Sequence, residues 1–303
     1  MGTSEKRPWR QRCYTPQELP IGSRVDEGNT ITDYDEEEIA RKLTISTKVA
    51  AAEWNKKKIN LLDTPGFNMF MADTKSALVA VEAMLIVVDG VAGVEVQTQK
   101  VWNFADEYQL PRAIVIDKLD RERSSFDRAL AHVQETFGRS AVPIHLPVGS
   151  ERDFNGIVDV IGMRAFCYSS DGNGRGKECD IPSNMADAAK AAHEALVEMI
   201  AEGNDELMEE FFSTGTLPEE HIQQGLREAI RARRIFPVMC ASGLHNVGSD
   251  LILNFVVENF PNPAEHEAWH GTIDGKEADR PVTDQSPVSV YVLKLLRIPS
   301  PAA

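Results

Sequence analysis

The sequence predicts an α/β protein built on an open, doubly wound, mostly parallel sheet, with an inserted α+β subdomain. The runs 83–90 and 112–117 are apolar throughout and end in an Asp-containing turn, which is typical of strands buried on both faces of a parallel sheet. Helix-like segments at 98–108 and 125–137 alternate with these runs. Such alternation predicts helices on both faces and a ligand crevice at the carboxyl ends of the strands.

Composition and charge exclude several classes of protein. The chain has 303 residues, of which 42% are hydrophobic and 26% charged, and a net charge of 32 − 47 = −15. An acidic chain is a poor non-specific ligand for phosphate backbones or anionic lipid. No signal-like segment and no apolar stretch approaching ~18 residues is present. We therefore predict a cytoplasmic chain with no membrane and no direct sequence-specific nucleic-acid binding.

The cysteines are the next constraint. Cys13, Cys167, Cys179 and Cys240 are far apart and show no Cys-x-x-Cys spacing. This spacing predicts neither a metal site nor a disulfide framework, and it favours a reducing compartment.

The order of elements divides the chain into segments. The residues before Arg24 have no periodicity, whereas 44–54 and 58–63 have the character of two strands joined as a hairpin. Two short strands are expected around Gly162, and amphipathic helices at 185–212 and 219–234. A buried strand at 235–242 and a helix at 248–260 then return to the sheet. We predict the following segments: leader 1–24, nucleotide-binding domain 25–155 and 235–262, inserted subdomain 156–234, linker 263–287, and a strand from 288 that starts a further domain at 288–303.

The first motif is Asp63-Thr64-Pro65-Gly66, which follows an apolar strand. In this position an Asp carboxylate can hold Mg²⁺ through water, and the backbone N–H of a Gly can approach a terminal phosphate. An ordinary turn at the end of a strand is an equally good interpretation of these four residues alone. Upstream, Thr44 begins a strand after an acidic segment, and its hydroxyl can complete a Mg²⁺ site.

Two further motifs follow buried strands. In Asp117-Lys118-Leu119-Asp120 the last carboxylate can accept hydrogen bonds from the N1 and N2 edge of guanine, and the Lys stem can pack on the purine. Ser242 and Gly243 follow the strand at 235–242, where small residues allow a backbone N–H to reach guanine O6. Each motif is weak alone, but their order along the chain is that of a GTP-dependent switch.

Longer phrases make the family recognisable. The segments "NLLDTPGF", "VVDGVAGVEVQTQKVW", "PRAIVIDKLDRE", "VPIHLPVGSERDFNGIVDVI" and "FPVMCAS" resemble the GTP-binding domain of translation elongation factor G, and in particular its elongation-factor-G-like branch, over about Arg24 to Leu296. The resemblance implies a fold of the P-loop GTPase type, an insertion such as 156–234, and a β-barrel second domain from about 288. It also implies GTP hydrolysis with Mg²⁺, the ribosome as partner, and a role in translocation or recycling.

The resemblance also assigns roles to individual residues. Thr44 and Asp63 resemble the Mg²⁺ ligands of the two switches, and Gly66 resembles the contact to the γ-phosphate. Lys118 and Asp120 resemble the guanine clamp, with Ser242 and Gly243 as the loop behind it. Thr64, Pro65, Phe67, Asp117 and Leu119 complete the expected GTP-binding set.

Three departures from the family pattern reduce the expected activity. The sequence contains no Gly-x-x-x-x-Gly-Lys-Ser/Thr phosphate loop, and "DGNGRGKE" at 171–178 does not substitute for one, so we expect the P-loop and the first strand to be missing. Phe67 stands where a water-positioning His is usual, and Phe cannot orient water. Asp117 stands where Asn is usual, and a carboxylate repels the acceptor N7 of guanine. Leu43, in place of Gly, is a smaller difference.

Three hypotheses follow from the sequence. The chain is a ribosome-associated GTP hydrolase, a non-catalytic pseudo-GTPase that serves as an interaction module, or a fragment with no function of its own. In each of them we expect weak or no binding of GTP by the chain as written, and no confident catalytic residue.

Overall fold

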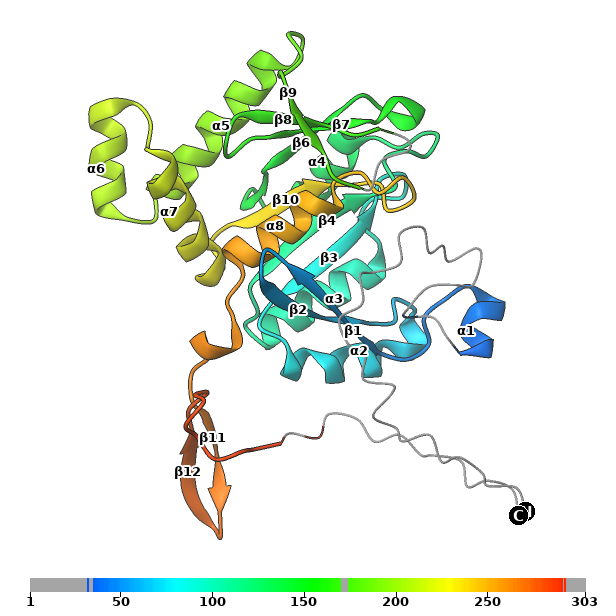
Figure 1. Cartoon of the computed structure of the whole chain (residues 1–303), viewed down its shortest axis with the longest axis vertical. Helices are drawn as coiled ribbons and strands as arrows, with labels where there is room; N and C mark the ends of the chain where they lie inside the picture. The colour runs from blue at the N-terminus through cyan, green and yellow to red at the C-terminus, as the bar shows by residue number, and fades with distance from the viewer. Residues whose placement is uncertain (1–31, 33–34, 170–173, 291, 293–303) are drawn as a thin grey trace. The chain divides into compact units, whose positions relative to one another are not determined.

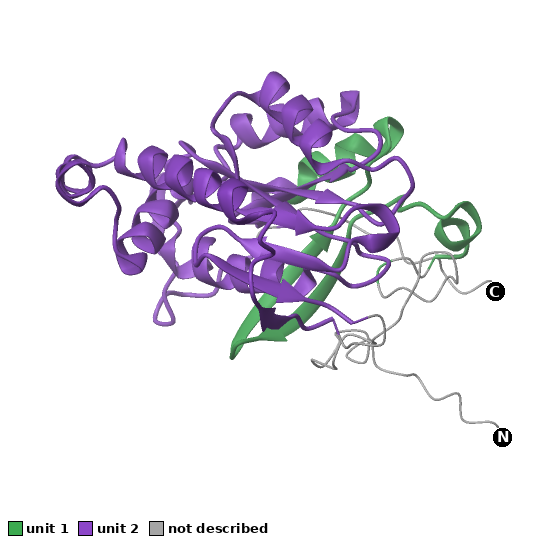
Figure 2. Ribbon diagram, turned by 90° about the horizontal axis from the view of Figure 1, so that it is seen from above, with its two compact units in different colours: residues 1–77 green, residues 78–303 purple. Residues whose placement is uncertain are grey.

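The computed structural model describes residues 32, 35–169, 174–290 and 292. The predicted leader 1–24 lies outside the described residues. The chain divides into two compact units, Met1–Ala77 and Leu78–Ala303 (Figure 2). The elements of the first unit are α1 (Glu36–Arg41), β1 (Lys48–Trp54), β2 (Lys57–Asp63), η3 (Asn68–Phe70) and α2 (Met71–Ala77).

The second unit contains the larger sheet and the inserted subdomain (Figure 1). Its elements are η4 (Leu78–Ala80), β3 (Met84–Asp89), α3 (Val96–Glu107), β4 (Arg112–Asp117), α4 (Phe126–Phe137), β5 (Ala141–Pro143), β6 (His145–Val148), η5 (Glu151–Asp153), β7 (Gly156–Asp159), β8 (Arg164–Cys167), β9 (Lys177–Cys179), α5 (Ala186–Ala201), α6 (Asp205–Thr214), α7 (Glu219–Arg231), β10 (Phe236–Cys240), α8 (Ser249–Asn259), η6 (Pro263–Glu265), β11 (Trp269–Ile273) and β12 (Lys276–Arg280).

The first unit is organised around the predicted hairpin. Strands β1 and β2 pair antiparallel, with Lys48 opposite Asp63 at one end and Trp54 opposite Lys57 at the other. The turn consists of Asn55 and Lys56, which both have positive φ, as a tight two-residue hairpin turn requires. The hairpin therefore agrees with the sequence prediction, except that its first strand begins at Lys48 and not at Thr44.

The larger sheet of the second unit is parallel, in the order β3-β4-β10-β5. Strand β4 is buried on both faces, because Ile114 and Ile116 pack with α3 and α4, whereas Ala113 and Val115 pack with α5, α7 and α8. Helices thus cover both faces, and the predicted doubly wound α/β fold is confirmed.

The expected nucleotide-binding segment 25–155 spans the boundary between the two units at Ala77. Strands β2 and β3 belong to separate sheets, and no strand among the described residues pairs with both of them.

The second sheet of this unit is antiparallel. It has the order β6-β7-β8-β9 and begins at His145, upstream of the insertion expected at 156–234. Ile144 joins the two sheets, because its N–H donates to Val238 O and its carbonyl accepts from Val160 N, both at 2.9 Å. The predicted helix 185–212 is two helices, since the Asn204 side chain caps a new helix by accepting from Glu206 N at 2.9 Å.

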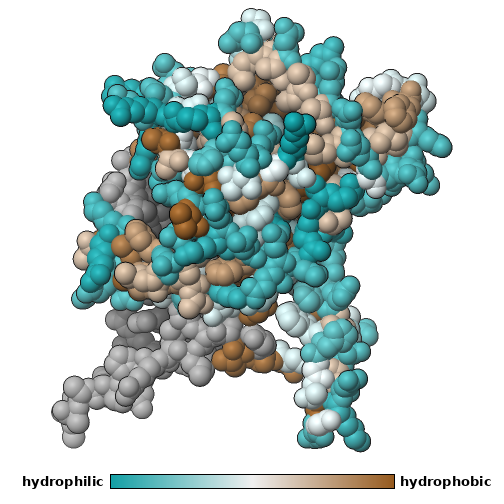
Figure 3. Space-filling model, turned by 180° about the vertical axis from the view of Figure 1, so that it is seen from behind, coloured by the Kyte–Doolittle hydropathy of each residue, from teal (hydrophilic) through white to brown (hydrophobic). Residues whose placement is uncertain are grey.

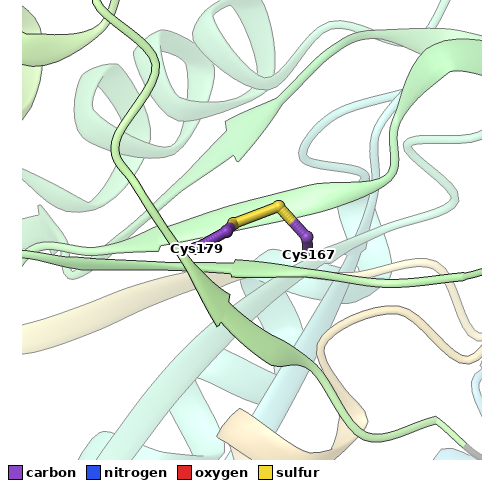
Figure 4. The surroundings of a disulfide bond; sticks show 2 residues. All are labelled: Cys167 and Cys179. Carbon is purple, nitrogen blue, oxygen red and sulfur yellow. A yellow bond between two sulfur atoms is a disulfide. The ribbon is translucent and has the colours of Figure 1, made fainter.

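A disulfide contradicts the prediction from cysteine spacing. Cys167 and Cys179 are bonded, and Cys240 is free and buried (Figure 4). Cys167 and Cys179 are 12 residues apart in sequence, but the pairing of β8 with β9 brings them together. No described helix has the length and apolar character needed to cross a bilayer.

The C-terminal part also differs from the prediction. The segment predicted as a linker, 263–287, contains the hairpin β11–β12, with Trp269 opposite Arg280. The predicted strand at 288–296 is not formed at 288–290 or at 292, and the rest of it lies outside the described residues. The face shown in Figure 3 is a mixture of hydrophilic surface and several apolar groups.

His145, the first residue of β6, makes the stability of the fold depend on pH. Its side chain is buried, and its Nδ1 has no hydrogen-bond partner among the described residues. Burial lowers the pKa of His145 from 6.5 to about 4. Since the unfolded chain binds the proton more readily, the stabilisation is complete above pH 6.5 and is lost as the pH falls towards 4.

We expect His145→Leu to remove this pH dependence. Between pH 7 and pH 4 the wild type should lose roughly 3 kcal/mol more of its unfolding free energy than the variant does. Urea unfolding at several pH values measures the difference. His270, whose exposed side chain pairs with Asp279, provides a matched control, because His270→Leu should keep the loss of stability that His145 causes. The prediction would be contradicted if the unfolding free energies of the wild type and His145→Leu changed with pH in the same way.

Candidate functional site

The carboxyl ends of three parallel strands meet at one edge of the larger sheet. Asp89 at the end of β3 lies opposite Asp117 at the end of β4, and Ile116 lies opposite Cys240 of β10. The Gly90 N–H donates to Asp117 O at 2.8 Å, which joins the first two loops. A Cβ at Gly90 would lie 2.9 Å from Leu119 Cδ2 and 3.0 Å from Asp117 O, so a larger residue would push these neighbours apart.

Asp117 and Gly243, two of the predicted nucleotide-binding residues, are in direct contact. The Gly243 N–H donates to Asp117 Oδ1 at 2.8 Å. The carboxylate is half-buried, whereas Gly243 is exposed. Asp117 therefore holds the loop after β10 in place by accepting a hydrogen bond, which is a role that an amide oxygen could also perform.

Asp120 and Ser242 form the second link between the same loops. Ser242 Oγ donates to Asp120 Oδ1 at 2.5 Å, and the His245 N–H donates to Ser242 Oγ at 3.2 Å. Ser242 is fully buried, and the Asp120 side chain is only 7% exposed. The second oxygen of Asp120 is 3.9 Å from His245 Nε2, too far for a hydrogen bond. The structure therefore brings Asp117, Asp120, Ser242 and Gly243 together.

Lys118 has a partner that the sequence motif did not indicate. Its backbone is left-handed, with φ +62°, and its Nζ donates to Asp89 Oδ2 at 2.8 Å. Burial raises the pKa of Asp89, but the hydrogen bonds from Lys118, Val91 N and Ala92 N outweigh burial and lower it. Asp89 thus stays ionised and holds the ammonium group of Lys118 at the carboxyl end of β3.

Leu119 differs from its predicted neighbours because its side chain belongs to the core. It is buried, and its N–H donates to Ala241 O at 3.4 Å. Ser124 Oγ donates to Leu119 O at 2.8 Å. Leu119 therefore positions Lys118 and Asp120 through its backbone and does not present its side chain to a ligand.

The first unit carries the second group of predicted residues, at one end of the hairpin. Asp63 ends β2, and Thr64, half-buried, leads to Pro65, whose carbonyl accepts a hydrogen bond from Thr74 Oγ1 at 2.6 Å. A Cβ at Gly66 would meet no atom within 4 Å, so the space beside its backbone is open. Phe67 follows and is 56% exposed.

Thr44 lies in the segment before β1 and is half-buried. The pairing of Lys48 with Asp63 places this segment at the same end of the hairpin as Asp63. Sequence analysis did not identify Glu38, which holds the segment: its Oε1 accepts from Ile45 N at 2.9 Å and from Ser46 N at 3.1 Å.

Glu38 is well suited to this positioning role. Burial raises the pKa of its carboxyl, but the backbone N–H groups of Ile45 and Ser46 and the ammonium of Lys48 outweigh burial and lower it. The ionised carboxylate therefore orders the residues that follow Thr44. A glutamate at the centre of an acidic run gives no signal in the sequence that separates it from its neighbours.

The described residues contain no cluster of three or more His, Cys, Asp or Glu side chains that could hold a metal ion. A hydroxyl and a carboxylate at one end of the hairpin nevertheless fit Mg²⁺, since that ion is usually held by one or two protein oxygens together with substrate phosphates and water. Thr44 and Asp63 would be those protein ligands.

The parallel sheet, with helices on both faces and loops that meet at its carboxyl edge, has a fold of the P-loop GTPase type. A family model described as "Elongation factor Tu GTP binding domain" matches residues 13–262, which is more than half of the chain. The chain therefore belongs to the elongation factor Tu GTP-binding domain family, as an elongation-factor-G-like GTP-binding domain.

A solved structure supports the same assignment. The crystal structure of ttk003000868 from Thermus thermophilus is 31% identical in sequence, with a TM-score of 0.74. The match covers 80% of this chain but only 36% of the Thermus chain. This chain thus spans less than two thirds of the length of that protein.

Proposed function

We propose that the chain acts in translation as the guanine-nucleotide-binding domain of a cytoplasmic elongation-factor-G-like GTPase that works on the ribosome in translocation or recycling. The observation that carries this proposal is the pair of linked loops, Asp117–Asp120 and Ser242–Gly243, at the edge of the parallel sheet. Membership of the translation GTPase family supports it.

Asp120 is proposed to bind the guanine base. Ser242 Oγ donates to one oxygen of the Asp120 carboxylate and fixes its orientation. The second oxygen would accept hydrogen bonds from the N1 and N2 edge of guanine. Gly243 is exposed, and its backbone approaches the site without a side chain. The stem of Lys118 would line the base, while its ammonium group stays bound to Asp89.

The first unit is proposed to sense the γ-phosphate. The open space at Gly66 allows its N–H to meet a phosphate oxygen, and Thr44 and Asp63 would hold Mg²⁺, which neutralises charge on the phosphates. Phe67 offers no hydrogen-bonding group to an attacking water. Since water-positioning residues contribute orders of magnitude to the rate, hydrolysis by this chain should be slow.

Nucleotide binding by the chain as written is expected to be weak. The sequence has no Gly-x-x-x-x-Gly-Lys-Ser/Thr pattern, and the N–H groups and Lys of such a loop carry much of the phosphate affinity. We expect fluorescent GDP with Mg²⁺ to bind with a Kd above about 1 µM, and adenosine nucleotides to bind more weakly still. Fluorescence anisotropy measures both affinities.

Two comparisons make this titration decisive. Asp120→Ala should abolish the preference for guanine over adenine nucleotides, whereas the exposed Glu122→Ala should leave it unchanged. A Kd tighter than about micromolar for GDP would contradict weak binding. Equal affinity for GDP and ADP in the wild type would contradict the guanine site itself.

The second candidate function is that of a non-catalytic interaction module. The exposed Phe67, in place of a water-positioning group, favours it. This function needs a stably folded chain with no GTP turnover. Cooperative thermal unfolding, combined with no phosphate release in the presence of ribosomes, would favour it over the GTPase.

A further inference from the structure

The disulfide of the inserted subdomain lies at an accessible edge. Strand β9 has three residues and is the last strand of its sheet, and among the described strands it pairs with β8 alone. Cys167 of β8 is exposed and Cys179 of β9 is half-buried. A small reductant can therefore reach the sulfur of Cys167.

The described residues between the two cysteines are bonded to the helix that follows the Ser242–Gly248 loop. Tyr168 Oη donates to Asp250 Oδ1 at 2.6 Å, and the Gly176 N–H donates to Asp250 Oδ2 at 2.8 Å. Asp250 lies in the first turn of α8 and is buried. The N–H of the adjacent Leu251 also donates to Asp250 Oδ1, at 2.9 Å. The buried carboxylate thus depends on the disulfide-closed segment for two of its hydrogen bonds.

Close packing also joins the inserted subdomain to the Ser242–Gly248 loop. Gly174 has φ +72° and lies against the Asn246 side chain so closely that a Cβ would clash. Gly248, at the end of the loop, leaves no room for a Cβ beside Ile157 of β7, at 2.7 Å, and Cys240 O, at 2.8 Å. The subdomain therefore packs directly against the Ser242–Gly248 loop.

We propose that the Cys167–Cys179 disulfide is a site of thiol–disulfide exchange, and that its state controls the order of the Ser242–Gly248 loop. The oxidised form holds β9 and the Gly174–Gly176 backbone in place against α8 and the loop. The reduced form releases them. The consequence for guanine binding rests on the function proposed above, but the control of loop order does not.

The reaction partner is a dithiol. A thiolate of the dithiol attacks Cys167 Sγ, the bond between the two sulfurs breaks, and Cys179 leaves as a thiolate that takes up a proton. The second thiol of the reductant attacks the mixed disulfide, which releases Cys167 as a thiol. The protein disulfide gains two electrons and two protons, and the dithiol is oxidised to its cyclic disulfide.

Reduction loosens the loop because little else holds β9. Its three residue pairs with β8 form its ladder in the described sheet. When the chain between the cysteines is no longer closed into a ring, it gains conformational entropy, and the two hydrogen bonds to Asp250 compete with water. A buried carboxylate that loses its donors becomes hydrated, and the first turn of α8 then opens.

Hydrogen–deuterium exchange of the full chain without nucleotide tests the proposal. Treatment with dithiothreitol should speed exchange in 242–252 by about tenfold or more. Exchange in α4, Phe126–Phe137, should not change. Cys167→Ser should exchange fast in 242–252 with or without dithiothreitol, and Tyr168→Phe should exchange faster than wild type although its disulfide is intact.

Three results would overturn the proposal. Peptide mapping of protein purified without reductant could find Cys167 and Cys179 as free thiols. Exchange in 242–252 could be unchanged by dithiothreitol. Exchange could instead rise equally in 242–252 and in α4, which would indicate general destabilisation. Because no nucleotide is present, a failure of the proposed guanine site affects none of these outcomes.

Discussion

Replacing Arg112 by alanine is expected to lower the free energy of unfolding by about 3–5 kcal/mol. Arg112 begins β4 and is only 1% exposed. Its Nη1 donates to Trp102 O at 2.8 Å, and its Nη2 pairs with Asp106. The guanidinium lies over the rings of Trp102 and Phe236, 4.3 and 4.8 Å from their centroids. Alanine would remove all these contacts and leave a cavity between α3, β4 and β10.

Urea unfolding at pH 7 measures this effect. Arg112→Met keeps much of the side-chain volume while it removes the charge and the hydrogen bonds, so its loss should be smaller than that of alanine. The exposed Arg152→Ala is the matched control and should change stability by less than about 0.5 kcal/mol. A loss below about 1 kcal/mol for Arg112→Ala would show that the buried guanidinium does not stabilise the sheet.

Replacing Asp117 by asparagine is expected to increase the affinity for guanine nucleotides by about tenfold. The amide oxygen can still accept the Gly243 N–H, which lies 2.8 Å from Asp117 Oδ1, so the linked loops should persist. The change removes a negative charge that repels both guanine N7 and the phosphates, and it adds a donor. The unfolding free energy should change by less than about 1 kcal/mol, because the loop hydrogen bond remains.

Titration with fluorescent GDP compares the variants. Glu122→Gln removes the same charge at an exposed position outside the linked loops, and it separates a general charge effect from a local one. Asp117→Ala removes the acceptor for Gly243 and should weaken binding. Unchanged or weaker binding by Asp117→Asn would show that the Asp117 charge does not limit the affinity, and the phosphate contacts would then be the limiting feature.

Much of the fold could be predicted because its strands and helices carry strong local patterns. The run 112–117 is apolar on both faces, and in the structure alternate residues of β4 pack against different helix layers. The ends of α3 and α4 lie within two residues of the predicted bounds. Periodicity did not separate β5 from β6, because only the hydrogen bonds of Ile144 show that the chain passes from one sheet to the other there.

Some of the site residues could likewise be predicted from the sequence, whereas others could be found only in the structure. The order of Asp63, Asp117, Asp120 and Ser242 along the chain is visible in the sequence, because each follows an apolar strand. The roles of Glu38 and Asp89 are not visible, since each acts on a partner distant in sequence or on backbone groups that only the folded chain presents. Leu119 shows the converse, because a residue inside the motif proves to be part of the core.

The sequence alone therefore determined the α/β class, the alternation of strands and helices in the parallel sheet, and the family, since hydrophobic periodicity and short motifs are local properties of the chain. The tertiary structure alone decided the Cys167–Cys179 disulfide, the start of the antiparallel sheet at His145, and the link between Asp120 and Ser242. Each of these depends on which strands lie side by side. Strand pairing is set by packing over the whole sheet, and no window of sequence contains that information.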